Sequence, residues 1–232
     1  MKAIDIMTVS VVTATRQTSV QSIVKSMLEH RISAVPIVDD EQRVVGIVSE
    51  GDLMNRPEAG THRRRSWWLS MFGDPKRHES EFEKAYGNTA ADVMTRKVVT
   101  VHENDSVASV AETLERLHIK RVPVVRDGKL IGIISRANLL QCVGQLYKGG
   151  VPEGDSVAQR KAIFDRLDEA GLRSYAINVI ILKDAVELWG IVDNAEQRKL
   201  ARLAVASVLG DRKIEDHLGV MDSLPLAGHG AI

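Results

Sequence analysis

The sequence DIMT at residues 5–8 returns as DVMT at residues 92–95, and the two stretches begin a long internal repeat. Further pairs follow in the same order: ISAVPIV (32–38) with IKRVPVV (119–125), and GIVSEGD (46–52) with GIISRAN (132–138). Two copies are too few for a solenoid. The repeat predicts an intramolecular pseudo-dimer, in which two like units face each other around a shared core and a shared cleft.

Each copy has the pattern strand, helix, strand, strand, helix, which predicts an α/β (α+β) fold. The first helix of each copy is expected to begin at a capping residue, Thr18 in one copy and Asp105 in the other. The predicted strands are 11–14, 34–38 and 44–49 in the first copy, and 121–126 and 130–135 in the second. A further helix is expected after Ser49 and after Ser135.

Apolar residues at helical spacing predict which helix faces are buried. The expected stripes are Val20, Ile23, Val24, Met27 and Leu28; Val107, Val110, Ala111 and Leu114; and Leu139, Leu140, Val143 and Leu146.

Residues 56–88 form an insertion that the second copy lacks, with a short helix expected at 79–86. Two tryptophans, Trp67 and Trp68, follow a run of arginines there and could form a stacking platform for nucleic acid. We favour an amphipathic helix that packs on the repeats or on a partner subunit. The domain prediction is 1–55 and 89–147 for the repeats, 148–154 for a linker, 155–220 for a small α+β domain and 221–232 for a tail.

The small domain has a helix at 157–167, a hairpin of strands at 177–182 and 186–192, and a last strand at 213–217. Asn194 is expected to cap a helix that buries Leu200, Leu203, Ala204 and Val208.

Composition limits the function. Basic and acidic residues balance at 31 each, which disfavours nucleic-acid binding, because such domains carry a positive excess. The single cysteine, Cys142, excludes an intrachain disulfide and is expected to act as a small apolar residue on a helix. The chain shows neither a signal peptide nor a membrane-spanning apolar run, so a cytoplasmic location is expected.

The two serine-to-helix junctions, Ser49 with Asp52 and Ser135 with Asn138, are the strongest chemical signal. Helix N-terminal N–H groups and a serine hydroxyl can hold phosphate, and a carboxylate one turn later can accept both hydroxyls of a ribose. Plain helix capping explains the same pattern. Pro36 and Pro123 indicate strands at the edge of a sheet, where neighbouring backbone groups are left to hydrogen-bond an adenine. Alternatively, the two prolines only protect the sheet edge from pairing with another strand.

These motifs, each present twice and in order, resemble a tandem cystathionine-beta-synthase (CBS) domain pair over about residues 1–147. The resemblance implies two pseudo-symmetric clefts for adenosyl ligands such as AMP, ADP, ATP, NAD or S-adenosylmethionine. Ser49 and Ser135 would hold phosphate, and Asp52 and Asn138 would hold ribose. The adenine walls would be Thr13, Ala14, Ile32, Ala34 and Pro36 in one cleft, and Thr100, Val101, Ile119, Arg121 and Pro123 in the other. Asn138 replaces the usual acid, so the two clefts should differ in affinity.

The segment from 155 to 220 resembles a BON domain, through the strand VELWGIV at 186–192 and the helix after it. That resemblance implies a protein-binding or membrane-binding module. Acidic residues slightly outnumber basic ones there, so we favour a protein partner. The CBS resemblance and the Trp67–Trp68 segment lead us to expect a homodimer.

The sequence is compatible with three classes of function. The first is a non-catalytic sensor, in which an adenosyl effector fills the clefts and changes what the BON-like domain presents. The second is a structural adaptor with vestigial clefts. The third is an enzyme, which is disfavoured because the sequence shows no P-loop and no metal-spaced cluster; His30, His118 and His217 are expected to be structural. No metal and no obligatory cofactor are predicted.

Overall fold

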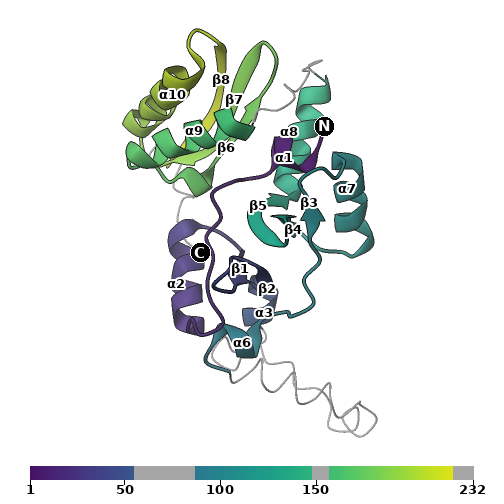
Figure 1. Ribbon diagram of the computed structural model, residues 1–232. Coiled ribbons are helices and arrows are strands. Elements are labelled where there is room, and N and C mark those ends of the chain that lie inside the picture. Colours follow the sequence, from purple (N-terminus) through teal and green to yellow (C-terminus); the bar gives the residue numbers. More distant parts are fainter. Residues whose placement is uncertain (55–86, 148–156, 222–232) are drawn as a thin grey trace, which may run out of the picture. The chain divides into compact units, whose positions relative to one another are not determined.

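The computed structural model describes residues 1–54, 87–147 and 157–221 (Figure 1). The chain divides into two compact units. Unit 1 contains residues 1–11, 100–126 and 131–232, and unit 2 contains residues 12–99 and 127–130. The predicted insertion, including its helix at 79–86 and Trp67 and Trp68, the linker, and the tail lie almost wholly outside the described residues.

Unit 2 holds the first repeat. Its elements are α2 (Val20–His30), β1 (Ala34–Val38), β2 (Val44–Ser49), α3 (Glu50–Met54) and α6 (Ala90–Val93). Strands β1 and β2 pair antiparallel, as the sequence predicts, and Asp39 stabilises their turn by accepting from the backbone N–H groups of Glu41 and Arg43. The predicted strand at 11–14 is wrong: only Ala14 forms a bridge, parallel to Ile37.

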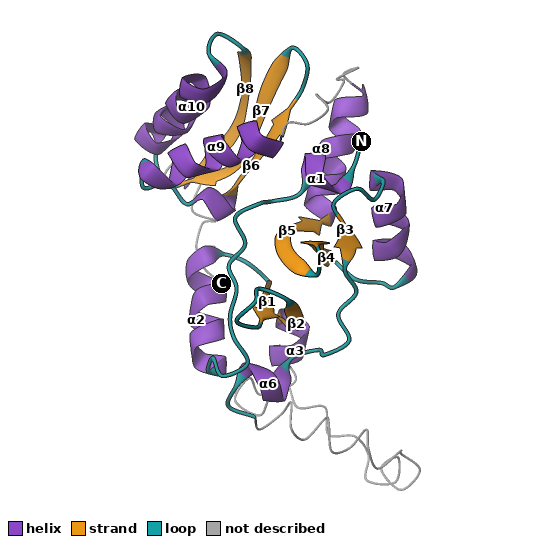
Figure 2. Cartoon of the chain, viewed as in Figure 1, coloured by secondary structure: helices purple, strands orange, loops and turns teal. Residues whose placement is uncertain are grey.

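Unit 1 holds the second repeat and the small C-terminal domain. The second repeat contributes β3 (Val101–His102), α7 (Val107–Arg116), β4 (Arg121–Arg126), β5 (Lys129–Ser135) and α8 (Arg136–Tyr147), with strand order β3-β4-β5 (Figure 2). The leading helix of the first repeat, α1 (Ala3–Ile6), also belongs to unit 1. Cys142 is buried with α1 and β4 side chains, and burial raises the pKa of its thiol. Cys142 therefore packs as the predicted small apolar residue.

The first helix of each repeat begins one residue later than predicted. Ser19 caps α2 and Ser106 caps α7, each by accepting a backbone N–H three residues on. The predicted caps instead close the preceding turns: Thr18 accepts from the N–H of Thr15, and Asp105 accepts from the N–H of His102.

The buried helix faces are narrower than predicted. In α2, Val20, Ile23 and Met27 enter the core, whereas Val24 is exposed and Leu28 is 73% exposed. In α8, Val143 is exposed and Leu140 is 71% exposed. The core covers only a narrow stripe of each helix, so the apolar residues beside that stripe remain exposed.

The leading segment of each repeat packs against the strands of the other repeat. In unit 1, Thr8 bridges Ile133 of β5, and in unit 2, Thr95 bridges Ile47 of β2. A glycine permits each approach, since a Cβ at Gly46 would overlap the side chain of Met94, and one at Gly132 would overlap that of Met7. The repeats have therefore exchanged their DxMT segments.

The C-terminal domain comprises α9 (Val157–Glu169), a 3-10 turn (Ser174–Ala176), β6 (Ile177–Ile181), β7 (Ala185–Val192), α10 (Ala195–Leu209) and β8 (Lys213–Val220). Helices α9 and α10 pack on one face of the β6-β7-β8 sheet (Figure 1). Asn194 caps α10 as predicted.

The buried face of α10 agrees with the prediction at Ala204 and Val208, which pack in the core, but not at the two leucines. Ala201, Ala204 and Val205 meet the sheet, whereas Leu200 and Leu203 are exposed.

Across the described parts of the chain, no helix is long and apolar enough to cross a membrane.

Candidate functional site

The first candidate site is the junction between β2 and α3. Asp52 accepts hydrogen bonds at Oδ2 from the backbone N–H of Ser49 (3.0 Å) and from the Ser49 hydroxyl (2.7 Å). The predicted phosphate-binding and ribose-binding side chains are therefore in contact, and the serine hydroxyl here donates to the carboxylate. Both side chains are partly exposed.

Thr95 belongs to this site, although the sequence analysis did not select it. Its hydroxyl donates to Asp52 Oδ1 over 3.2 Å. Thr95 reaches the site because the exchanged segment bridges Ile47, two residues before Ser49. The recurrence of Met-Thr at 7–8 and 94–95 is the sequence signal that could have identified it.

The second candidate site, between β5 and α8, repeats the same junction with an amide. Asn138 Oδ1 accepts from the N–H of Ser135 (2.8 Å) and from its hydroxyl (2.7 Å). Its Nδ2 donates to the carbonyl oxygen of Ile6 (3.0 Å) and to the Thr8 hydroxyl (3.4 Å). Asn138 is only 4% exposed. Both ends of this amide are bonded to the chain itself.

The two junctions therefore differ in chemistry. A carboxylate offers about four acceptor positions and a negative charge, which suits the two hydroxyl donors of a ribose. The amide of Asn138 has one acceptor oxygen, which already takes two hydrogen bonds. Asn138 acts as a buried cap in this conformation, whereas Asp52 lies nearer the surface.

The predicted adenine wall of the first repeat lies on β1 and the segment before α2. Ala34 is opposite Ser49 in the β1–β2 register, and Ala14 donates its N–H to the carbonyl oxygen of Pro36 (3.1 Å). The ring nitrogen of Pro36 lies on the side of β1 that faces Ala14. The missing N–H of the proline therefore removes no hydrogen bond between β1 and β2. Thr13 is exposed and Ile32 is half-buried.

The predicted wall of the second repeat follows the same plan. Val101 pairs with Val124 in parallel register, which places β3 beside the strand that carries Pro123 and Arg121. Pro123 is buried, Arg121 and Ile119 are half-buried, and Thr100 is exposed.

An apolar groove of about 1230 Å³ lies in unit 2 along the outer side of α2 and α3. Val24, Leu28 and Met54 contribute exposed apolar surface to it. Ser33 and Glu50 line the groove, but Ser49 and Asp52 do not. Ile32, one of the predicted adenine-wall residues, lines the groove as well, so the groove lies beside the first junction without including its two side chains.

Comparison with known families agrees with this architecture. The CBS domain model matches residues 3–58 and 90–144, and the BON domain model matches residues 155–222. The chain belongs to the CBS-domain proteins, as a tandem CBS domain pair followed by a BON domain.

The CBS region is similar to plant proteins. The chain is 30% identical over 142 residues to the CBS domain-containing protein CBSX1, chloroplastic, of Arabidopsis thaliana, which covers 57% of this chain and 59% of that protein. The crystal structure of CBSX2 in complex with AMP is 28% identical, with a TM-score of 0.55, and covers 62% of this chain and 97% of that one. This chain thus spans about three fifths of the length of its first curated relative.

Another relative is named as an enzyme. L-aspartate semialdehyde sulfurtransferase of Methanocaldococcus jannaschii is 26% identical over 141 residues, which is 60% of this chain but 23% of that protein. The similar region is under a quarter of that protein, and the non-catalytic role of this chain stays a prediction.

Proposed function

We propose that this protein is a regulatory sensor, in which the clefts of the CBS pair bind an adenosyl ligand and the BON domain receives the signal. The Ser49–Asp52 junction is the first of the two clefts to test. The observation that carries the proposal is the cluster of Ser49, Asp52 and Thr95 at the predicted ribose position. A ribose diol can donate to the carboxylate of Asp52. The Ser49 hydroxyl, released from Asp52, can then donate to a phosphate oxygen.

The similar CBSX2 structure was solved with AMP, which makes AMP the first ligand to test. ADP, ATP, NAD and S-adenosylmethionine share the adenosyl group and complete the test series. The ligand is an effector in this proposal, so no obligatory cofactor is assigned.

Contacts within unit 1 support a route from the second repeat to the BON domain. The guanidinium of Arg160, on α9, donates to the carbonyl oxygens of Ile4 and Met7. The carbonyl of Ile6, in the same turn, accepts from Asn138. A ligand that moved Asn138 would disturb the turn that anchors α9. Asn178 of β6 also donates to Gln141 of α8 (2.6 Å), a second link between these parts.

The adaptor function remains the second candidate, because the closed environment of Asn138 favours a vestigial second cleft. An adaptor would hold its BON domain in one arrangement without a ligand. The two functions differ in whether an adenosyl compound changes the protein.

Thermal unfolding of the full chain with each adenosyl compound tests the sensor function. A ligand at 100 times its Kd adds about 2.7 kcal/mol to the free energy of unfolding, which is a shift of several degrees. The double variant Ser49→Ala, Asp52→Ala should lose that shift. Ser106→Ala is the matched control, because it removes a helix cap outside both junctions and should keep the shift.

The absence of any shift with the whole series would overturn the sensor proposal and favour the adaptor. A shift that persists in the double variant would show that the ligand binds elsewhere on the chain.

A further inference from the structure

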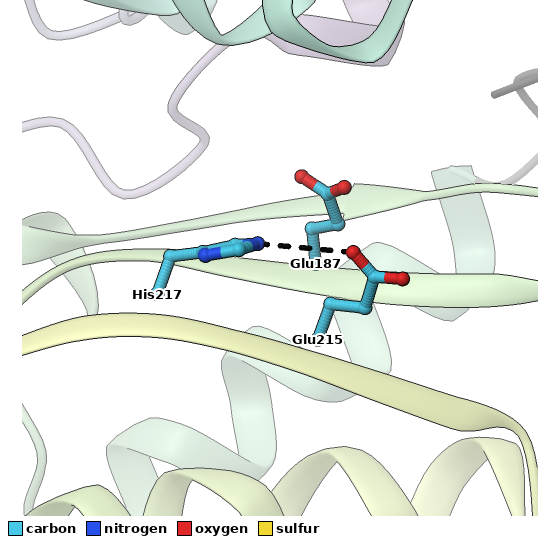
Figure 3. Close-up of side chains that lie close together, drawn as sticks. All are labelled: Glu187, Glu215 and His217. Atoms are coloured by element: carbon cyan, nitrogen blue, oxygen red, sulfur yellow. Dashed lines mark ion pairs between the residues drawn. The ribbon is translucent and has the colours of Figure 1, made fainter. Parts of the chain in front are cut away.

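The face of the BON sheet opposite α9 and α10 brings three side chains that could bind a metal together. Glu187 of β7 and Glu215 of β8 are direct partners in a parallel register, and His217 lies two residues after Glu215 on the same face. One ligand atom from each of the three lies within 4.8 Å of the others, and His217 Nε2 is 3.8 Å from Glu215 Oε2 (Figure 3). The sequence alone predicts no metal ligands here, because the three residues do not stand at metal-binding spacing.

We propose that Glu187, Glu215 and His217 bind a divalent first-row transition-metal ion. Such an ion lies about 2.0–2.2 Å from nitrogen and carboxylate ligands, so ligands that share it are separated by roughly 3–4 Å. The His217–Glu215 distance of 3.8 Å lies in this range, and no ligand-atom separation in the cluster is above 4.8 Å, so small side-chain rotations can close the rest. This inference is independent of the adenosyl proposal.

The surroundings of the three side chains hold them in place. Trp189 Nε1 donates to Glu187 Oε2 over 2.7 Å. The Trp189 ring also stacks on the His217 imidazole, with centroids 4.1 Å apart and planes 22° apart. One tryptophan therefore orients two of the three ligands, as the hydrogen-bonding partners of ligand side chains do in metal sites. All three ligands stand on paired strands, which position side chains more precisely than loops do.

Charge also favours a cation. Glu187 is fully buried and faces Glu215 directly, and like charges opposed across strands repel each other. Lys213 Nζ lies 2.7 Å from Glu215 Oε1, so the cluster already contains one cationic partner. A divalent ion would neutralise both carboxylates. The 32% exposed side chain of His217 gives the ion a route from solvent.

A separate observation on the same face of the sheet is a buried side-chain oxygen without a hydrogen-bond donor among the described residues. Asn178 of β6 is paired with Trp189 in the register and is only 6% exposed. Its Oδ1 accepts no hydrogen bond from the residues that the structure describes. Buried polar atoms of this kind commonly mark an ordered water or an ion. A water bound to the ion would supply the donor.

The donor set selects the type of metal. An imidazole with two carboxylates suits Zn²⁺, Mn²⁺, Fe²⁺ or Co²⁺, whereas Ca²⁺ and Mg²⁺ prefer oxygen ligands alone. Co²⁺ is a convenient probe because it quenches the fluorescence of a nearby tryptophan. The chain has three tryptophans, so replacing Trp67 and Trp68 by phenylalanine leaves Trp189 as the reporter.

Titration of this full-length reporter protein with CoCl₂ tests the proposal, with ZnCl₂ as the competitor. We expect saturable quenching at one equivalent that Zn²⁺ reverses. His217→Gln and Glu187→Gln should each weaken Co²⁺ binding by about 10- to 100-fold. Lys213→Ala should strengthen Co²⁺ binding, because it removes the ammonium group that competes with the ion for Glu215. His102→Gln, at an exposed histidine of β3, is the control and should have no effect.

Circular dichroism and the Tm of each variant establish that it is folded. Absence of saturable quenching in the folded reporter protein would overturn the proposal. Quenching that His217→Gln and Glu187→Gln leave unchanged would also overturn it, because the ion would then bind elsewhere.

Discussion

Asp52 and Asn138 occupy equivalent positions in the two repeats, but their surroundings demand different side chains. The Nδ2 of Asn138 donates to the Ile6 carbonyl in a buried place. Asn138→Asp would set a carboxylate oxygen against that carbonyl. We expect a loss of about 1–3 kcal/mol in the free energy of unfolding, measured in urea at pH 7.

Asp52→Asn is the matched exchange in the first repeat. The amide keeps an acceptor for Ser49, so we expect less than about 1 kcal/mol of lost stability but weaker AMP binding. Equal destabilisation by the two exchanges would contradict the difference between the junctions.

Asp92 gives a pH-dependent prediction. Its carboxylate caps α6 by accepting from the N–H and the hydroxyl of Thr89 and from the N–H of Asn88. The backbone bond from Thr89 is the main cause that lowers the pKa of Asp92 from 3.8. A lowered pKa means that this stabilisation is present above pH 3.8 and is lost as the pH falls through the folded-state value.

Asp92→Ala should therefore cost about 1 kcal/mol at pH 7, and the difference from the unmodified protein should shrink below pH 3.8. Urea unfolding at a series of pH values measures both. Glu112→Ala, at an exposed site on α7, is the control and should change little. A constant difference down to pH 2 would refute the role of this carboxylate.

The close approach of the DVMT segment (92–95) to β2 depends on Gly46. A methyl group there would overlap Met94, so Gly46→Ala should destabilise the protein by about 1–3 kcal/mol through overpacking. The shifted segment should also displace Thr95 from Asp52 and weaken AMP binding.

Gly144→Ala is the comparison variant, because a Cβ at this position of α8 meets nothing within 4 Å. We expect it to be neutral or stabilising by up to about 1 kcal/mol, as usual for glycine inside a helix. Chemical denaturation measures both variants. An unchanged free energy of unfolding in Gly46→Ala would show that the fold does not depend on the close approach of Met94 to this glycine.

The hairpin strands of the two repeats were predictable because β-branched runs on both sides of a turn leave little choice, whereas the β-branched run at 11–14 forms only the bridge at Ala14. Strands β1, β2 and β4 have the predicted bounds, and β5 begins one residue earlier. Helix caps were one residue off because Thr18 and Ser19 are both good caps, and only the preceding turn decides which one is used. Exposure of Leu28 was not predictable from periodicity alone, since it depends on how wide a face the core covers.

Pairing between distant segments limited the site prediction. The repeated motifs identified Ser49 and Asp52, but Thr95 joins them only through the exchange of segments. Glu187 and His217 are far apart in sequence and meet only because β7 and β8 pair in parallel. The residues named for the adenine walls are still predictions.

The link between the second repeat and the BON domain depends on Arg160, which is almost fully buried. Burial lowers the pKa of its guanidinium to about 10, so the group remains charged at neutral pH. Arg160→Met should free the carbonyls of Ile4 and Met7 and loosen α1. We expect faster amide hydrogen exchange over residues 3–8, measured by mass spectrometry.

Arg166→Met, at an exposed ion pair on the same helix, is the control and should leave that exchange unchanged. Unchanged protection in Arg160→Met would mean that α9 does not hold the N-terminal turn, and the proposed route to the BON domain would fail.

Isothermal titration of the full-length protein with AMP tests the central claim most directly. The account predicts saturable binding that Asp52→Ala weakens at least about tenfold, or 1.4 kcal/mol, and that the control Ser106→Ala leaves unchanged. Absence of binding by the unmodified protein, or equal affinity in Asp52→Ala, would contradict it.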